Sequence, residues 1–499
     1  MKRLAAINVV GLTEALIGEH TPRIAEFVKR GALTRIHPAF PAVTCTAQSN
    51  YLTGKTPAEH GIVGNGWFNR ELAEVQFWKQ SNNIVHGPKI WDVLRASTPD
   101  PRSQTPSPIS VANCFWWFNM YSGVDYSITP RPMYPADGRK FFDVYSWPYS
   151  IREEIKRDLG EFPFFGFWGP AAGIKTPQGT ADCATRWIAE SAKWIEHKYS
   201  PTLNLIYLPH LDYNLQRHGP YSAGYGYPQT TLSDAETKNL LLEQGPILNP
   251  AIVPDLNAID AIVGDLIDFF AKRDVQVVLL SEYGITNVDT PVHLNRIFRE
   301  HGWLTVKEEL GREILDAGAS KVFAVADHQV AHIYVNDFKL MGPAHDLVAG
   351  LAGVERVAFK GSKPDAAFWH ARAGQLVAVA KENAWFTYYY WLDDARAPDF
   401  ARTVDIHRKP GYDPVELFLD PKIPLPKLKI AWRLLQKKLG FRMLMDVIPL
   451  DATLVKGSHG RCPDNPKDWP VFITEKKGLA AAPAIESTEV YQALLRHLT

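Results

Sequence analysis

The chain has 499 residues, enough for a large core and for roughly two to four structural units at about 150 residues each. Its 54 basic and 54 acidic residues cancel, so bulk charge gives no reason to expect a nucleic-acid polymer as a partner. Four cysteines without paired spacing predict reduced thiols and a cytoplasmic protein, and no apolar run approaches the about 20 residues that cross a bilayer.

The first part of the chain alternates predicted strands and helices. Residues 3–10 indicate a buried strand, 21–30 a helix with proline just inside its start, and 31–36 a second strand. This order is typical of an α/β fold with a doubly wound, mostly parallel sheet. Ligands of such sheets collect at the carboxyl ends of the strands.

Residues 41–68 contain the most specific pattern, a Thr/Ser-rich run at 44–49 followed by a predicted helix end and a His-Gly pair. A helix opening at this run places hydroxyls beside unpaired backbone N–H groups and the positive end of the helix dipole. Such a position holds an oxyanion, and a hydroxyl there can attack phosphorus or sulfur. The simpler alternative is that Thr44 or Thr46 is a helix N-cap.

Two segments interrupt the alternation. Residues 114–170 are rich in aromatic residues and proline, which predicts a cap-like insertion over the carboxyl edge of the sheet. An aromatic subcore beneath long loops explains that composition equally well. Residues 338–440 predict a smaller α+β insertion, so that 1–337 and 441–499 form the core.

Three acidic or histidine side chains follow later predicted strands or turns. Asp212 comes just after the apolar strand 203–208, and Glu282 follows the strand 276–280. His459 lies in a glycine-flanked turn. Carboxyl ends of parallel strands meet at one edge, so these side chains are candidate metal ligands.

Two further histidines occur on a predicted strand at 326–335. His328 and His332 would point to the same face of that strand, which permits joint ligation, although packing is the simpler explanation. The basic helix predicted at 426–439 is interpreted as a solvated surface helix.

In order along the chain, these motifs resemble the alkaline phosphatase superfamily, in particular its nucleotide pyrophosphatase/phosphodiesterase-like branch. Thr44 lies nine residues before Thr53 of the TG pair, as the family's nucleophilic threonine does. His60-Gly61-Ile62 and Asn65 match the HGI segment and its asparagine, which implies that Asn65 binds substrate. Asp212 matches the D-x-x-x-H motif, and His459 matches the final GxHG.

The resemblance implies two zinc ions at the substrate phosphate, but three ligand positions depart from the pattern. Val10 stands at the position of the first-strand aspartate, Gln216 at that of the D-x-x-x-H histidine, and Tyr283 follows Glu282 where the family has Asp-His. Asp327, His328 and His332 are possible replacements. The remaining candidate ligands suit one harder ion such as Mn²⁺, Mg²⁺ or Ca²⁺ as well as zinc, and they are Asp212, Gln216, Glu282 and His459.

Three functions are consistent with the sequence. The first is a metal-dependent hydrolase of a phosphodiester or pyrophosphate bond in a small-molecule phosphate ester, acting through a phosphorylated Thr44. The second is a divergent one-metal phosphoryl or sulfuryl transferase of a biosynthetic pathway. The third is a non-catalytic binding protein on a degenerate hydrolase fold.

Overall fold

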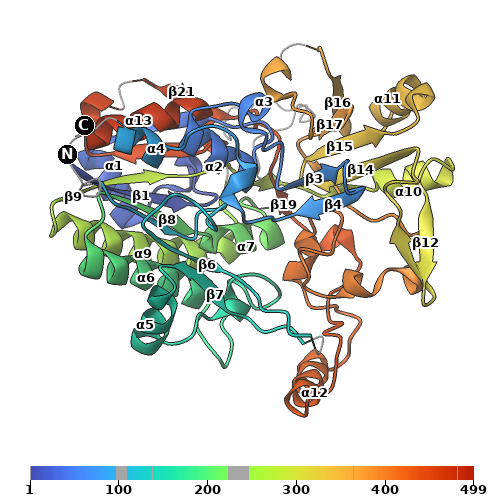
Figure 1. Cartoon of the computed structure of the whole chain (residues 1–499), viewed down its shortest axis with the longest axis horizontal. Coiled ribbons are helices and arrows are strands. Elements are labelled where there is room, and N and C mark those ends of the chain that lie inside the picture. Colours follow the sequence, from blue (N-terminus) through green and yellow to red (C-terminus); the bar gives the residue numbers. More distant parts are fainter. Residues whose placement is uncertain (1, 97–108, 137–138, 223–246, 363–364, 480–481) are drawn as a thin grey trace.

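A nine-stranded sheet forms the larger half of the molecule (Figure 1). The computed structural model describes residues 2–96, 109–136, 139–222, 247–362, 365–479 and 482–499. In spatial order the strands are β21 (Ala484–Glu486), β2 (Ala32–His37), β20 (Val471–Thr474), β9 (Val275–Leu280), β1 (Arg3–Val9), β8 (Leu203–Leu208), β5 (Val111–Cys114), β6 (Tyr126–Pro130) and β7 (Val144–Trp147).

The centre of this sheet is parallel, which confirms the predicted α/β class. β1 pairs in parallel with both β8 and β9, so that Asn8 has Tyr207 on one side and Leu280 on the other. β1 and β8 are apolar and buried along nearly their whole length because helices cover both faces of the sheet. Only β20 and β7 run antiparallel to neighbours in the nine-stranded sheet.

The helices pack in two layers on the sheet. On one side α6 (Cys183–Tyr199) packs on β8 and α9 (Val253–Ala271) on β9, flanked by α1 (Pro22–Arg30) and α5 (Ser150–Leu159). On the other, α13 (Val490–Leu498) packs on β1 and contacts α2 (Thr44–Thr53) and α4 (Ile90–Ala96). The expected helix at 21–30 is therefore present as α1.

The carboxyl ends of β1, β8 and β9 meet at one edge and carry the candidate site. β8 leads through Pro209 into α7 (His210–His218), which places Asp212 in the first turn of a helix. β9 ends at Leu280, and Glu282 and Tyr283 follow after Ser281.

A second, four-stranded antiparallel sheet lies beside the first (Figure 1). Its order is β14 (Val322–Asp327), β15 (Val330–Val335), β17 (Leu376–Ala380) and β16 (Val354–Phe359), with α10 (Leu294–Glu300) on β14 and α11 (Met341–Ala349) on β16. A separate cluster of buried apolar side chains packs around this sheet. Except for Phe68 and Phe77, all of its buried members lie at or after Val288 in the sequence. We propose that the smaller unit begins near residue 288 rather than 338, because β14 and β15 pair only within it.

Short elements complete the description. They are α3 (Pro57–His60), the hairpins β3 (Gly66–Asn69) with β4 (Glu74–Phe77) and β12 (Val306–Glu309) with β13 (Arg312–Leu315), and the pairs β10 (Thr286–Asn287) with β19 (Gly457–Ser458) and β11 (Thr290–Val292) with β18 (Ala384–Phe386). The predicted basic helix is α12 (Pro426–Lys438), which stands out from the body in Figure 1. None of the described helices is long and apolar enough to cross a membrane.

Two local expectations differ from the structure. The predicted strand 326–335 is a tight hairpin instead, in which Asp327 ends β14 and His328 occupies the turn with φ 61°. Apolar alternation does not reveal such a turn, because neither Gly nor Pro marks it. The aromatic segment 114–170 is also not only a cap, since β6 and β7 extend the sheet from within it.

Candidate active site

Thr44 is the first residue of α2, and its side chain reaches the carboxyl edge of the sheet. Neither Thr44 nor Thr46 is the N-cap, because that position is Val43. The buried Thr44 hydroxyl lies 3.4 Å from the hydroxyl of Tyr283. The Thr46 hydroxyl donates instead to the carbonyl of Ile62 at 3.3 Å. Of the two threonines, only Thr44 lines the pocket described below.

Tyr283 connects Thr44 to Asp212. Its hydroxyl donates to Oδ1 of Asp212 at 3.2 Å while lying beside the Thr44 hydroxyl. Its ring stacks on His459 with centroids 3.6 Å apart and planes inclined by 6°. The phenol therefore fills the space between the predicted nucleophile and the predicted metal-binding carboxylate.

Asp212 is held by neutral hydrogen-bond donors. Gln216 donates its amide to Oδ2 of Asp212 at 2.8 Å, and the hydroxyl of Tyr412 donates to Oε1 of Gln216 at 3.1 Å. Nε2 of His459 lies 4.0 Å from Oδ1 of Asp212. Burial raises the pKa of Asp212 to about 7, against the hydrogen bonds from Tyr283 and Gln216, which lower it.

Glu282 is fully buried on the other side of Thr44. Its Oε1 accepts hydrogen bonds from Asn8 at 2.6 Å and from the amide of Gln48. Burial raises the pKa of Glu282 to about 8, and hydrogen bonding from Gln48, Asn8 and the Thr44 hydroxyl opposes that rise. A carboxyl group that titrates near neutrality beside a hydroxyl can serve as a general base.

A third buried carboxyl group, Asp327, organises the histidine in the β14–β15 turn. Oδ1 of Asp327 lies 2.8 Å from Nδ1 of His328, whose ring is sandwiched between Tyr412 and His459 at 3.5 and 3.7 Å. Asn65 donates its backbone and side-chain N–H groups to Asp327.

The amide of Asn65 is already engaged within the protein. Its oxygen accepts the backbone N–H of Cys45 at 3.0 Å, and its nitrogen donates to Asp327 at 3.1 Å. Asn65 thus ties the first turn of α2 to the β14–β15 turn. Substrate binding by Asn65, as the resemblance implies, stays a prediction, and in this arrangement the residue positions Thr44. The neighbouring HGI histidine, His60, contacts Asn50 through Nε2 at 2.7 Å and is likewise structural.

A small cavity of about 70 Å³ opens over Thr44. The described lining contains no lysine or arginine, and it consists mainly of aromatic residues. They are Trp78, Trp117, Phe167, Trp168, Tyr207, Tyr213, Tyr283 and Tyr412, together with Thr44, Pro209, Asp212, His328 and Ile406. Trp117, Phe167 and Trp168 come from the aromatic segment 114–170, so part of that segment lines the cavity.

The side chains present do not fit the two-ion centre that the resemblance implies. Val10 is buried and has no donor atom, and the ring of Tyr283 stands between Thr44 and Asp212. Within the described residues, no group of three or more His, Cys, Asp or Glu side chains is arranged to hold a metal ion, whereas zinc needs at least three ligands. Of the four predicted ligands, Gln216 lies 2.8 Å and His459 lies 4.0 Å from Asp212. Ligation of one ion stays a prediction for Asp212, Gln216, Glu282 and His459.

The suggested replacement ligands serve other contacts. His332 has Nε2 2.9 Å from the carbonyl of Val63, and its Nδ1 accepts the backbone N–H of Gly374 at 3.1 Å. The sequence predicts that His328 and His332 share one face of a strand. This prediction is wrong, because His328 is in the turn and His332 is in β15. His332 is therefore a packed, satisfied histidine.

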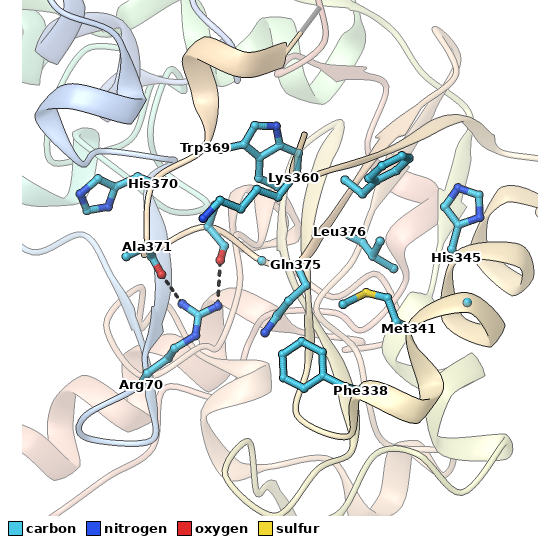
Figure 2. Close-up of a pocket in the computed structure, with 14 residues that line it drawn as sticks. Arg70, Phe338, Met341, His345, Lys360, Trp369, His370, Ala371, Gln375 and Leu376 are labelled. Atoms are coloured by element: carbon cyan, nitrogen blue, oxygen red, sulfur yellow. Dashed lines mark hydrogen bonds between the residues drawn. The ribbon is translucent and has the colours of Figure 1, made fainter. Parts of the chain in front are cut away.

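A larger cavity of about 550 Å³ lies away from this site, between α11, the end of β16 and the start of β17. Figure 2 shows that Arg70 enters it and donates to the carbonyls of Ala371 and Ala373. Its described lining contains no acidic, serine, threonine or cysteine side chain. Its titratable groups besides Arg70 are His345, His370 and Lys360.

Comparison with known proteins gives one family and a common fold. The family model described as type I phosphodiesterase / nucleotide pyrophosphatase matches residues 4–413. Murine ectonucleotide pyrophosphatase/phosphodiesterase 5, solved as an inactive variant with AMP, superposes with TM-score 0.53 at 13% identity, covering 100% of this chain and 95% of that one. Phosphonoacetate hydrolase from Sinorhizobium meliloti 1021, solved with phosphonoformate, gives TM-score 0.54 at 11% identity and 100% and 96% coverage. A search of curated protein sequences finds no match.

Proposed function

The chain belongs to the type I phosphodiesterase / nucleotide pyrophosphatase family of phosphodiesterase- and pyrophosphatase-type hydrolases, and from this premise we propose that it cleaves a small phosphodiester with Thr44 as nucleophile. The observation that supports the proposal is the position of Thr44. Its hydroxyl stands at the start of a ten-residue buried helix, within the aromatic pocket and beside Tyr283 and Glu282. The α2 N-terminus offers backbone N–H groups and a positive dipole end to an oxyanion.

The chemistry can be assigned to side chains of this chain. Oγ of Thr44 attacks phosphorus and its proton passes to the ionised carboxylate of Glu282. The bond from phosphorus to the leaving oxygen breaks, and that oxygen takes a proton from the protonated carboxyl group of Asp212. Water then attacks phosphorus and gives a proton to the ionised Asp212. The bond from phosphorus to Oγ of Thr44 breaks, Oγ takes its proton back from Glu282, and a phosphomonoester is released.

The pocket favours a particular class of ester. With no lysine or arginine in its described lining and with Asp212 and Glu282 nearby, a dianionic phosphomonoester is repelled more than a monoanionic diester. The walls of Trp78, Trp117 and Trp168 suit an aromatic leaving group. AMP and phosphonoformate are ligands of the similar structures, and both are small phosphorus compounds.

This proposal differs from the family's usual chemistry in its need for metal. The family generally depends on divalent metal, typically zinc, which supplies Lewis-acid charge stabilisation when bound. Because the donor set here does not fit two such ions, no step above uses one. Turnover of bis(4-nitrophenyl) phosphate with and without a chelator tests the proposal, with Thr44→Ala as the matched inactive control.

Tyr283 favours a second candidate, a non-catalytic binding protein on the same fold. Its phenol fills the space between Thr44 and Asp212, and its stacking on His459 holds it there. An aromatic ligand without a cleavable ester would still fit the walls of the pocket. Binding of bis(4-nitrophenyl) phosphate without turnover by the unmodified protein would select this candidate. A transferase would instead turn over the diester and pass the phosphoryl group to an acceptor other than water.

A further inference from the structure

Helix α12 is attached to the body through its polar side. Lys429 pairs with Asp446 at 2.9 Å, and Arg433 pairs with the same carboxylate at 3.0 Å. Lys437 donates to the carbonyl of Lys140 at 2.9 Å. Lys429, Arg433 and Lys437 are spaced four residues apart, so they share one side of the helix. The side opposite to them faces solvent.

That solvent side carries a continuous apolar row, which we call the α12 stripe. Leu428, Trp432, Leu435 and Leu439 recur at intervals of four, three and four residues and therefore lie on one face. Their exposed fractions are 63%, 58%, 44% and 64%. Leu425 extends the same row at 63% exposure. A helix of a globular protein normally turns such a row inward, so this orientation needs a partner.

The charge around the stripe has one sign. Residues 421–445 contain no aspartate or glutamate, although the whole chain has equal numbers of acidic and basic residues. The lysines and arginines of this segment are Lys422, Lys427, Lys429, Arg433, Lys437, Lys438 and Arg442. Lys427 and Lys438 are exposed and lie on one flank of the stripe. Phe441 and Leu444 add exposed apolar side chains just beyond it.

We propose that α12 docks the protein on an anionic lipid surface, with the α12 stripe inserted among the lipids and the flanking lysines at the headgroups. An amphipathic helix with leucine and tryptophan on one face and lysine and arginine beside it has the composition of an interfacial helix. The segment is basic and therefore complementary to anionic lipid. It also protrudes from both sheets in Figure 1, so a flat surface can reach it. No described helix spans the bilayer in this arrangement, and α12 lies in its surface.

Vesicle co-sedimentation of the full chain tests the proposal. We expect binding to vesicles of phosphatidylcholine with about 30% phosphatidylserine, at least about tenfold weaker binding to phosphatidylcholine alone, and loss of binding as salt rises. Leu428→Gln/Trp432→Gln/Leu435→Gln and Lys427→Glu/Lys438→Glu should each weaken binding by about tenfold or more. Leu310→Gln, a fully exposed leucine on the β12–β13 hairpin, is the matched control and should bind like the unmodified protein.

Three results would overturn the proposal. The first is no co-sedimentation with anionic vesicles, and the second is undiminished binding of the triple glutamine variant. The third is a dimer in sedimentation velocity that the triple variant converts to monomer, which would make a second copy the occupant of the stripe. No residue of α12 is buried, so the variants keep the fold, and near-ultraviolet circular dichroism verifies this.

Discussion

The ring of Tyr283 lies flat on the ring of His459, with centroids 3.6 Å apart and an angle of 6° between the planes. His459 is the imidazole that the resemblance assigns to metal ligation, and its Nδ1 is fixed 2.8 Å from the carbonyl of Ala42. Burial lowers the pKa of His459 well below its usual value, so the ring is neutral. The tyrosine at one predicted ligand position thus packs against the histidine at another.

Substitutions of Tyr283 should separate its hydroxyl from its ring. Tyr283→Phe keeps the stack on His459 and loses the hydrogen bond to Asp212, so we expect a loss of about 0.5–1.5 kcal/mol in unfolding free energy. Tyr283→Ala also loses the buried ring and should cost about 3–5 kcal/mol. Urea unfolding measures both, and equal costs would contradict the importance of the stack.

Substitutions of Thr44 and Thr46 should have opposite effects. Thr44→Ala should abolish diester turnover with little change in stability, because its hydroxyl faces the pocket. Thr46→Ala should retain turnover and lose about 1 kcal/mol of stability, because it removes a buried hydrogen bond to Ile62. Steady-state kinetics with thermal unfolding measures both effects. An active Thr44→Ala together with an inactive Thr46→Ala would identify Thr46 as the nucleophile.

Stability should fall as pH rises through neutrality. The folded protein holds protons on Asp212 and Glu282 up to pKa values of about 7 and 8, whereas an unfolded chain releases them near pH 4. The stabilisation is complete below the unfolded pKa and is lost as pH rises through the folded pKa, at up to about 1.4 kcal/mol per pH unit for each group. Buried neutral histidines oppose this slope only below about pH 6.5.

In the interval from about pH 6.5 to 8 the slope comes from carboxyl groups with raised pKa values, which include Asp212, Glu282 and also Asp468, whose pKa burial raises to about 7. Glu282→Gln keeps a neutral group at the same place and should show a shallower fall over this interval than the unmodified protein. Asp212→Asn should do the same. Denaturant unfolding at several pH values measures the slopes, and parallel slopes for all three proteins would show that neither carboxyl group has a raised pKa.

Restoring the family's ligands should create metal binding. Val10→Asp, Gln216→His, Glu282→Asp and Tyr283→His together supply the missing donors, and we expect zinc stoichiometry to rise from fewer than two towards two ions per chain. The metal-free variant should be less stable, because each unpaired buried polar group costs about 1–3 kcal/mol. Elemental analysis of dialysed protein measures the stoichiometry. Two tightly bound zinc ions in the unmodified protein would show that other residues complete the centre.

The sequence predicts the sheet and the location of the site because both depend on local patterns. Strand ends and the spacing from Thr44 to Thr53 place Thr44 at the start of α2, and the structure has that helix. The sequence does not reveal the hairpin turn at His328, because neither glycine nor proline marks its positive φ. Asn8 and Gln48 are the buried hydrogen-bond partners of Glu282, and both lie more than 200 positions before it in the sequence, so no local pattern predicts these contacts.

The aromatic walls were predicted only as a composition. Trp78 and Tyr412 meet at 6.1 Å although more than 300 positions separate them, and no local pattern encodes such a contact. The sequence likewise does not predict that the Tyr283 hydroxyl lies between Thr44 and Asp212. A substitution at a ligand position shows that a donor is lost, whereas only the fold shows what fills the space.

The most direct test of the account is turnover of bis(4-nitrophenyl) phosphate by dialysed, chelator-treated protein, measured before and after addition of zinc. The account predicts turnover that persists in the chelator and is absent from Thr44→Ala. It should be greatest between about pH 7 and 8, where ionised Glu282 and protonated Asp212 coexist, and should fall on either side. Turnover that disappears in the chelator and returns with two zinc ions per chain would contradict it.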